Sequence, residues 1–178
     1  MKRVAILGST GSIGCSALAV VDAHADRLQV VGLAAGQNAE LLGEQIARYR
    51  PRIAAMATGA AIDRLRATGA SRGVVIAGEG RDGLIAVATH PDADVVLCAS
   101  SGTEALEAVL AAIAQRKTIA LANKEVLVMA GGIVTEAAAR YGVAILPVDS
   151  EHNAIHQCLH GRAAGDIRRL ILTAVTKI

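Results

Sequence analysis

The sequence predicts an α/β protein built on a doubly wound, mostly parallel sheet. Short apolar runs alternate with helical stretches that carry one apolar face, and polar connections between them are short. The apolar residues are almost all Ala, Val, Leu and Ile, since the 178 residues include two Tyr and no Phe or Trp. Such residues suit a sheet that helices bury on both faces.

The predicted elements follow one another in strict alternation. Apolar runs bounded by polar or glycine-rich turns predict strands at Val4–Leu7, Leu28–Ala34, Ile53–Ala57, Gly73–Ala77, Asp94–Cys98, Thr118–Ala122 and Val143–Val148. Apolar residues at helical spacing predict helices over Ile13–Ala25, Gly102–Gln115 and Gly131–Arg140. A further helix is expected to begin after Asn38, a good N-cap residue, and to end before Pro51. Ala-rich helical stretches follow the third and fourth strands.

A glycine-rich turn follows the first strand, with Gly8, Gly11 and Gly14 at spacings of three. The first glycine would give the backbone freedom to turn, the second would leave room for a phosphate, and the third would let the helix pack closely. An anion is favoured at such a helix N-terminus. The amides that would face it belong to Thr10, Gly11, Ser12 and Ile13. We interpret the turn as part of a Rossmann-type dinucleotide site; the alternative is an ordinary strand–turn–helix corner.

Polar clusters come directly after five of the predicted strands. They are Gly8–Ser12, Gly36–Asn38, Ser100–Gly102, Asn123–Glu125 and Asp149–Glu151. The carboxyl ends of parallel strands line one crevice, in which ligands bind. We therefore expect these clusters to converge on one site, although Ser, Asp and Asn also serve as helix caps.

The end of the second strand indicates which dinucleotide is preferred. Folds that prefer NAD usually end this strand with Asp or Glu, which binds the ribose 2′-hydroxyl. Here no acid stands in Val30–Gly36, and Gln37 and Asn38 offer neutral donors. NADP is therefore predicted, but no arginine stands beside this turn in the sequence.

Asp149 and Glu151 could hold a metal ion together, because positions two apart face the same side of an extended segment. Two carboxylates and water suit Mg²⁺ or Mn²⁺. Alternatively, Asp149 or Ser150 caps a helix that runs to Leu159, and spacing alone favours this second interpretation. Lys124 could anchor an anionic substrate or could simply be solvated. A histidine stripe, formed by His152, His156 and His160, is interpreted as partly exposed rather than as a metal site.

Composition excludes several classes of function. A net charge of +2 without a basic run argues against nucleic acid as a partner. Cys15, Cys98 and Cys158 form no Cys-x-x-Cys pair and suit reduced thiols in the cytoplasm. The first apolar run, Val4–Leu7, is too short for a signal peptide, and no run is long enough to span a membrane.

Four motifs together resemble 1-deoxy-D-xylulose 5-phosphate reductoisomerase, a family of the non-mevalonate route to isoprenoids. They are Gly8–Gly14, Ala35–Asn38, Ala122–Glu125 and Pro147–Ala154, in this order and spacing. The resemblance implies that NADPH is bound by Thr10, Gly11, Ser12, Ile13, Gly36, Gln37, Asn38, Asn123 and Glu125. Some relatives carry lysine in place of Gln37. The resemblance therefore implies that this chain binds the 2′-phosphate more weakly than those relatives do.

The resemblance also implies an active site at Lys124 and Asp149–Glu151. It assigns a small phosphorylated sugar to Lys124, Ser150 and Glu151, with Lys124 and Glu151 catalytic. It makes Asp149 and Glu151 ligands of Mg²⁺ or Mn²⁺, in preference to the capping interpretation. The product would be 2-C-methyl-D-erythritol 4-phosphate. The implied domains are an NADPH-binding domain over 1–148 and the start of a catalytic domain over 149–178.

The resemblance changes near the end of the sequence. In the family, the strand that begins at Leu170–Ala174 continues into Ser-Gly-Gly-Pro, whereas this chain has Val175–Ile178. We therefore expect a truncated chain that carries the cofactor half and is inactive alone. The alternative is a non-catalytic NADP-binding module. The full-length family member is expected to be a homodimer.

Overall fold

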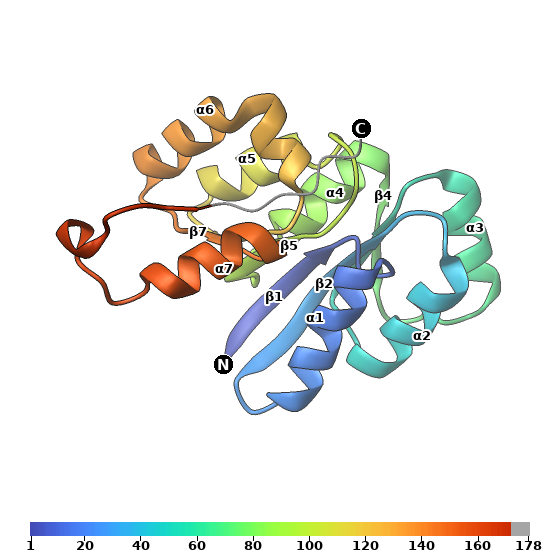
Figure 1. The fold of residues 1–178 in the computed structure, drawn as a ribbon. Coiled ribbons are helices and arrows are strands. Elements are labelled where there is room, and N and C mark those ends of the chain that lie inside the picture. The colour runs from blue at the N-terminus through green and yellow to red at the C-terminus, as the bar shows by residue number, and fades with distance from the viewer. Residues whose placement is uncertain (172–178) are drawn as a thin grey trace, which may run out of the picture.

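The structure is a computed structural model that describes residues 1–171 and contains a seven-stranded parallel sheet (Figure 1). The strands lie in the order β4-β3-β2-β1-β5-β6-β7, so the first strand is central. Their bounds are β1 Lys2–Leu7, β2 Leu28–Ala35, β3 Ile53–Met56, β4 Val75–Glu79, β5 Val95–Cys98, β6 Thr118–Leu121 and β7 Ile145–Pro147. All six neighbouring pairs are parallel, which confirms the predicted fold class.

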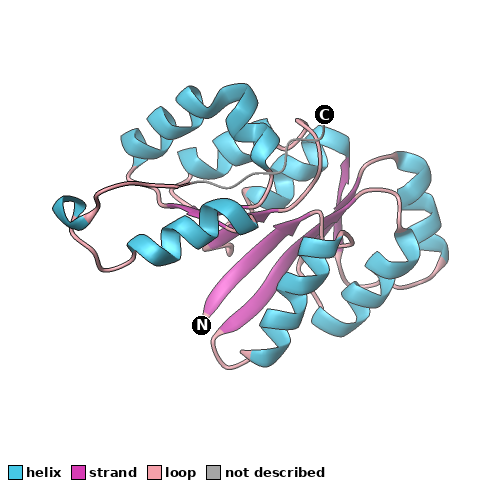
Figure 2. Ribbon diagram, in the orientation of Figure 1, coloured by secondary structure: helices cyan, strands magenta, loops and turns pink. Residues whose placement is uncertain are grey.

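Helices cover both faces of this sheet (Figure 2). Their bounds are α1 Ser12–Ala23, α2 Ala39–Tyr49, α3 Gly59–Ala67, α4 Gly80–Ala88, α5 Leu106–Ala114, α6 Lys124–Tyr141 and α7 Ser150–Leu159, with a short 3₁₀ turn at Ala164–Asp166. Helices α1, α2 and α3 pack on one face, and α4, α5 and α6 pack on the other. Within residues 1–171, none of the helices combines the length and apolar character needed to cross a bilayer.

The core consists of aliphatic side chains, as the composition predicts. Large side chains that are fully buried include Leu33 and Leu42 on the α1–α3 face and Val109 and Ile113 on the α4–α6 face. Residues alternate between the two faces along β1, where Ile6 belongs to one cluster and its neighbours to the other. Burial on both faces explains why the buried positions of the strands are apolar.

The strand predictions are confirmed to within two residues at each end. Two helix predictions are wrong at their starts. The helix expected from Gly102 begins at Leu106, and the one expected from Gly131 begins at Lys124. In the second case Asn123 caps the helix, and the glycines mark a break rather than a start, since the backbone of Ala130 is non-helical (φ −143°, ψ 29°). The polar cluster Asn123–Glu125 is therefore a helix start.

The segment from Leu170 onward is described only for its first two residues. Leu170 and Ile171 are exposed and do not form a strand. The remainder of the strand implied from Leu170 to Ala174, and the divergent residues Val175–Ile178, lie outside the described residues.

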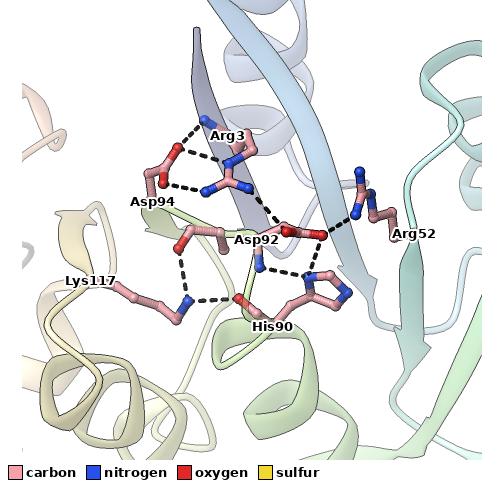
Figure 3. A network of polar contacts seen from close by, with 7 residues as sticks. Arg3, Arg52, His90, Asp92, Asp94 and Lys117 are labelled. Atoms are coloured by element: carbon pink, nitrogen blue, oxygen red, sulfur yellow. Dashed lines mark hydrogen bonds and ion pairs between the residues drawn. The ribbon is translucent and has the colours of Figure 1, made fainter.

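A group of charged and polar residues links the amino ends of several strands, and we call it the amino-edge network (Figure 3). Its members are Arg3, Arg52, His90, Asp92, Asp94 and Lys117. The Arg3 guanidinium donates to both oxygens of Asp94, at 3.2 and 2.9 Å, and to Asp92 at 3.0 Å. Arg52 also pairs with Asp92. These bonds join the starts of β1 and β3 to the loop that leads into β5.

Lys117 completes the amino-edge network from the turn before β6. Only 5% of this residue is exposed, and its Nζ donates to the carbonyl oxygens of His90 at 2.7 Å and Ala93 at 2.8 Å. Burial lowers the pKa of Lys117 below its ordinary value. Its ammonium group is a donor to the Ala93 carbonyl oxygen and a second donor to the His90 carbonyl oxygen, which also accepts from the Ala93 amide at 2.9 Å, so its role is structural.

Candidate functional site

A cavity of about 490 Å³ lies at the opposite edge of the sheet, where the strands have their carboxyl ends. We call it the carboxyl-edge cavity. Its walls come from the turns after β1, β2, β3, β4 and β5, as the parallel topology requires. The lining residues are Gly8, Thr10, Gly11, Ser12, Ile13, Ala34, Ala35, Gly36, Ala55, Met56, Ala57, Gly80, Leu84, Ala99, Ser100, Ser101 and Glu104. Three of the five predicted polar clusters therefore meet in one site. No residue of Asn123–Glu125 or Asp149–Glu151 lines this cavity, so the expectation that all five clusters converge is not borne out.

The three glycines of the first turn have the separate roles that their spacing predicts. Gly8 has a φ of +89°, and a Cβ there would lie 2.6 Å from the Ala99 oxygen. A Cβ on Gly14 would lie 2.3 Å from the Gly8 oxygen, so the helix needs glycine for close packing. Gly11 differs, because its Cβ would meet only the Gly8 oxygen at 3.4 Å and would otherwise project into free space beside the cavity.

Gly11, the residue before α1, lines the cavity. Its backbone is extended there (φ −79°, ψ 169°), and no side chain caps the helix. The amides of the first turn are thus available to an anion, and the dipole of the 12-residue helix favours one. Gly36 faces the cavity with nothing within 4 Å of its Cβ position. The residues present fit a dinucleotide, which needs close approach of backbone to its phosphates.

A side chain of α2 holds the glycine-rich turn in place. The side chain of Gln45 is buried, and its Nε2 donates to the backbone oxygen of Ser9 at 2.9 Å. Ser9 itself is fully buried. Gln45 was not predicted from the sequence, because it lies on the buried face of a helix and 36 residues separate it from Ser9.

The turn after β2 carries Gln37 and Asn38; the predicted cap at Asn38 is confirmed, whereas the contacts of Gln37 were not predicted. Asn38 caps α2, since its Oδ1 accepts from the Leu41 amide at 3.0 Å. The Gln37 side chain accepts from Thr58 at 3.3 Å and from Arg64 at 3.2 Å. The expectation that no arginine stands beside this turn is correct for the sequence and wrong for the structure, because α3 brings Arg64 across β3.

Asn123 lies on the other side of the cavity, where it organises the loop after β5. Its Nδ2 donates to the carbonyl oxygens of Ser100 at 2.6 Å and Gly102 at 2.7 Å, and its Oδ1 accepts from the Val126 amide at 3.1 Å. This amide is 3% exposed and both of its donor hydrogens are used within the protein. Asn123 therefore shapes the wall that Ser100 and Ser101 form.

Lys124, Asp149, Ser150 and Glu151 form a second polar group beyond this wall, at the starts of α6 and α7. Partial burial would raise the pKa of Asp149, but hydrogen bonds from His152 and the charge of Lys124 lower it below its ordinary value. A hydrogen bond from the Ser150 hydroxyl, at 2.9 Å, lowers the pKa of Glu151, and Lys124 adds to this effect. Both carboxylates are therefore ionised at neutral pH.

Asp149 caps α7, so the capping interpretation that spacing favours is confirmed, and the preference against it drawn from the resemblance is wrong. Its Oδ1 accepts from the His152 amide at 3.0 Å and contacts the His152 ring nitrogen Nδ1 at 2.6 Å. The other oxygen, Oδ2, has no hydrogen-bond partner within residues 1–171, and neither has Oε1 of Glu151. Capping and metal binding thus use different oxygens and are compatible.

The donor chemistry of this group fits a hard divalent cation. Mg²⁺ commonly takes one or two protein carboxylates and completes its shell with water and substrate oxygens. In the described part of the chain, no three His, Cys, Asp or Glu side chains lie close enough to hold a metal among them. The histidine stripe is exposed, as predicted, and the ring nitrogen Nδ1 of His152 contacts Oδ1 of Asp149.

Several cavity residues could not be predicted from the polar clusters. Ala57 follows β3, and Gly80 and Leu84 belong to α4, which follows β4; neither segment places a hydroxyl, amide or carboxylate side chain at the cavity. Glu104 lies in the loop that had been predicted as helix. The signal that would have found them is topological: every strand of a parallel sheet ends at the same edge.

Comparisons with known proteins agree with this geometry. The sequence profile of 1-deoxy-D-xylulose 5-phosphate reductoisomerase matches residues 4–131, and that of the C-terminal domain of the same enzyme matches residues 145–177. The chain is 55% identical to 1-deoxy-D-xylulose 5-phosphate reductoisomerase of Anaeromyxobacter dehalogenans over 174 residues, which is 98% of this chain and 44% of that protein. The corresponding Bacillus cereus protein is 50% identical over 98% of this chain and 45% of its own length.

Solved structures are similar over the same region. The reductoisomerase of Zymomonas mobilis in complex with NADPH has a TM-score of 0.82 and 41% identity, and the match covers 88% of this chain and 41% of that one. A reductoisomerase in complex with NADPH, fosmidomycin and magnesium has a TM-score of 0.84 and 38% identity, with coverages of 90% and 40%. The chain thus spans less than half the length of these relatives.

Proposed function

The chain belongs to the 1-deoxy-D-xylulose 5-phosphate reductoisomerase family, and from this premise we propose that it binds NADPH in the carboxyl-edge cavity. It would form the cofactor half of an enzyme that rearranges and reduces 1-deoxy-D-xylulose 5-phosphate to 2-C-methyl-D-erythritol 4-phosphate. The observation that carries the proposal is the uncovered backbone at Gly11 and Gly36, which face one cavity from two adjacent strands.

The cofactor residues divide by what they offer. The pyrophosphate would lie on the amides of Thr10, Ser12 and Ile13 at the N-terminus of α1, and beside Gly11, whose own amide donates to the Gly8 oxygen at 3.1 Å. Gly36, Gln37 and Asn38 would lie along the adenosine ribose, because the end of the second strand is where that sugar binds in such folds. Asn123 would act mainly through the loop that it holds, and Glu125 would lie near the nicotinamide end of the site.

The substrate would bind beyond the cavity wall that Ser100 and Ser101 form, at Lys124, Ser150 and Glu151. Lys124 supplies a cation that already lowers the pKa of both neighbouring carboxylates, so it can attract an anionic sugar. Asp149 and Glu151 would hold Mg²⁺ or Mn²⁺ through their unengaged oxygens. Such an ion would polarise the hydroxyketone oxygens of the sugar and stabilise negative charge as the carbon skeleton rearranges.

We further propose that the domain boundary lies near residue 148. The sheet is completed by β7, which ends at Pro147, and α7 follows with no buried residue.

Cys15, Cys98 and Cys158 are all free thiols, which supports a reducing compartment and hence the cytoplasm. The homodimer implied for the full-length family stays a prediction.

A fluorescence titration of the chain with NADPH and NADH tests the cofactor proposal. We expect a micromolar dissociation constant for NADPH, which corresponds to about −8 kcal/mol, and at least about tenfold weaker binding of NADH. Gly11→Val should weaken both, because its side chain enters the space of the phosphates. Gly132→Ala is the matched control, since a Cβ there has no neighbour within 4 Å and lies on α6 away from the cavity. Equal affinity for the two cofactors would contradict the NADP preference.

A further inference from the structure

Arg64 reaches from α3 to the turn after β2, across a sequence separation of 27 residues. Its Nη2 donates to the backbone oxygen of Gln37 at 3.1 Å and to the side-chain Oε1 of the same residue at 3.2 Å. The Thr58 hydroxyl donates to that Oε1 at 3.3 Å. Two donors from the turn after β3 and from α3 therefore fix the oxygen of the Gln37 amide.

This arrangement leaves donors free on both residues. With its oxygen engaged, the Gln37 amide presents Nε2 outward, and in the hydrogen bonds of residues 1–171 this nitrogen has no partner. Arg64 uses only Nη2, so Nε and Nη1 remain available. No carboxylate of the described chain lies within 4.0 Å of the Arg64 guanidinium; the salt bridges formed from α3 involve Arg66 instead. The guanidinium keeps its charge at any physiological pH.

The location of these donors indicates which ligand they could bind. Gly36 lines the cavity, and Gln37 is the next residue, at the end of the strand that faces the adenosine ribose in dinucleotide-binding folds. In this position an acidic residue selects a 2′-hydroxyl, and an arginine selects a 2′-phosphate. Here the acid is absent, and the arginine comes from the following helix rather than from the turn itself.

We propose that Arg64 binds the 2′-phosphate of NADPH and is the residue that determines the preference for NADPH over NADH. The proposal rests on the proposed function, because it requires the carboxyl-edge cavity to bind the dinucleotide. The guanidinium provides the charge and a fork of N–H groups that matches phosphate oxygens, while Gln37 contributes one neutral donor beside it.

The competing explanation is that Arg64 only fastens α3 to the turn after β2. The two explanations differ in which ligands should lose affinity when Arg64 is replaced. A purely structural role would weaken ligands with and without a 2′-phosphate equally. A role in recognition would weaken only those that carry the phosphate.

The test compares four ligands on the full chain: NADPH, NADH, 2′,5′-ADP and 5′-AMP. The variant is Arg64→Gln, which removes the charge and keeps a polar side chain. Arg66→Gln is the matched control, because it removes the same charge from the same helix, where Arg66 pairs with Asp63 at 3.7 Å. Thermal melting of each variant verifies that the fold is intact before the titrations are compared.

We expect Arg64→Gln to raise the dissociation constants of NADPH and 2′,5′-ADP about tenfold or more, while those of NADH and 5′-AMP change less than about twofold. Arg66→Gln should leave all four within about twofold. Adding Gln37→Lys to Arg64→Gln should restore NADPH binding, since it returns a cation to the same place.

Two results would overturn the inference while the proposed function stands: unchanged NADPH affinity in Arg64→Gln, or an equal loss for NADPH and NADH. Failure of the unsubstituted chain to bind any of the four ligands would instead overturn the proposed function and this inference with it. The binding of the unsubstituted chain thus separates the two failures.

Discussion

The two edges of the sheet have opposite construction. At the amino edge, charged side chains have partners within the protein: the Arg3 guanidinium donates to both oxygens of Asp94, and the Lys117 ammonium donates to two carbonyl oxygens. At the carboxyl edge, glycines leave the backbone uncovered at Gly11 and Gly36. The first arrangement leaves few groups free for a ligand, whereas the second leaves amides and hydroxyls free.

The difference shows how one fold separates stability from binding. Loops at the amino edge can be fastened by ion pairs without affecting the cavity, because the length of the strands lies between them. Loops at the carboxyl edge must keep unpaired donors, and buried polar atoms without partners cluster there. They are the side-chain oxygens Ser9 Oγ, Gln45 Oε1 and Ser100 Oγ, among the described residues. Substitutions at the two edges should therefore have separable effects on unfolding and on cofactor binding.

The largest effect is expected where the carboxyl edge is tightly packed. Gly14→Ala places a Cβ 2.3 Å from the Gly8 oxygen, so α1 must move away from the turn. We expect a loss of about 3 kcal/mol in the free energy of unfolding and loss of NADPH binding, despite the better helix propensity of alanine. Urea unfolding and fluorescence titration measure the two quantities. The matched variant Gly11→Ala should bind NADPH more weakly at nearly unchanged stability, and equal destabilisation by both would contradict the distinction between these glycines.

A smaller loss of stability is expected at the amino edge from Lys117→Met. The change keeps the aliphatic stem but removes the ammonium donor from the Ala93 carbonyl oxygen and one of the two donors from the His90 oxygen, which should cost about 2 kcal/mol. NADPH affinity should not change, because the residue lies at the far end of the strands. A variant that is destabilised and also loses cofactor affinity would show that the edges are coupled.

Asp94→Asn should give a still smaller, pH-dependent effect. Hydrogen bonds from Arg3 lower the pKa of Asp94 from 3.8 to about 2. Because the pKa is lower in the folded state, the stabilisation is complete above 3.8 and is lost as the pH falls through about 2. Solvent screens this partly exposed pair, so we expect about 1 kcal/mol at pH 7.

The measurement for Asp94→Asn is urea unfolding of both proteins from pH 7 downward. Their difference in stability should shrink across the interval between the two pKa values. Asp63→Asn is the control, because Asp63 is 77% exposed and makes one 3.7 Å pair with Arg66. A difference that does not depend on pH would mean that the Arg3 pairing is not its source.

The smallest effect on stability is expected from Asp149→Asn at the carboxyl edge. Asparagine caps helices as well as aspartate does, so α7 should persist and the free energy of unfolding should change by less than about 0.5 kcal/mol. The metal ligand would be lost. We expect calorimetry to detect Mn²⁺ binding in the millimolar range or weaker for the unsubstituted chain, and less for the variant. Unchanged Mn²⁺ binding would point to the histidines of α7 instead.

The sequence was sufficient for features that depend on local pattern. The strands, the glycine turn and the caps at Asn38 and Asp149 each depend on residues within a few positions of one another, and all are confirmed. The start of α6 was missed because Gly131 and Gly132 resemble a helix boundary, whereas the capping signal at Asn123 was interpreted as a binding loop.

Features that depend on the third dimension could not be predicted in the same way. Arg64 contacts Gln37 because β3 and α3 bring it there, and nothing in either segment indicates the other. The amino-edge network likewise joins Arg3 to residues 89 and 91 positions away. The sequence predicts that strands share an edge, but not which long side chains reach across it.

The central place of β1 has a consequence for the order in which the protein can fold during synthesis. Its partner on one side, β2, follows within the first 35 residues, and the helices of the α1–α3 face are complete at Ala67. Its partner on the other side, β5, ends only at Cys98, and the opposite face needs α6, which ends at Tyr141. One layer of helices can therefore assemble before the second half of the chain has been synthesised and has emerged from the ribosome. Until β5 emerges, the free side of β1 is an open strand edge that a chaperone could protect.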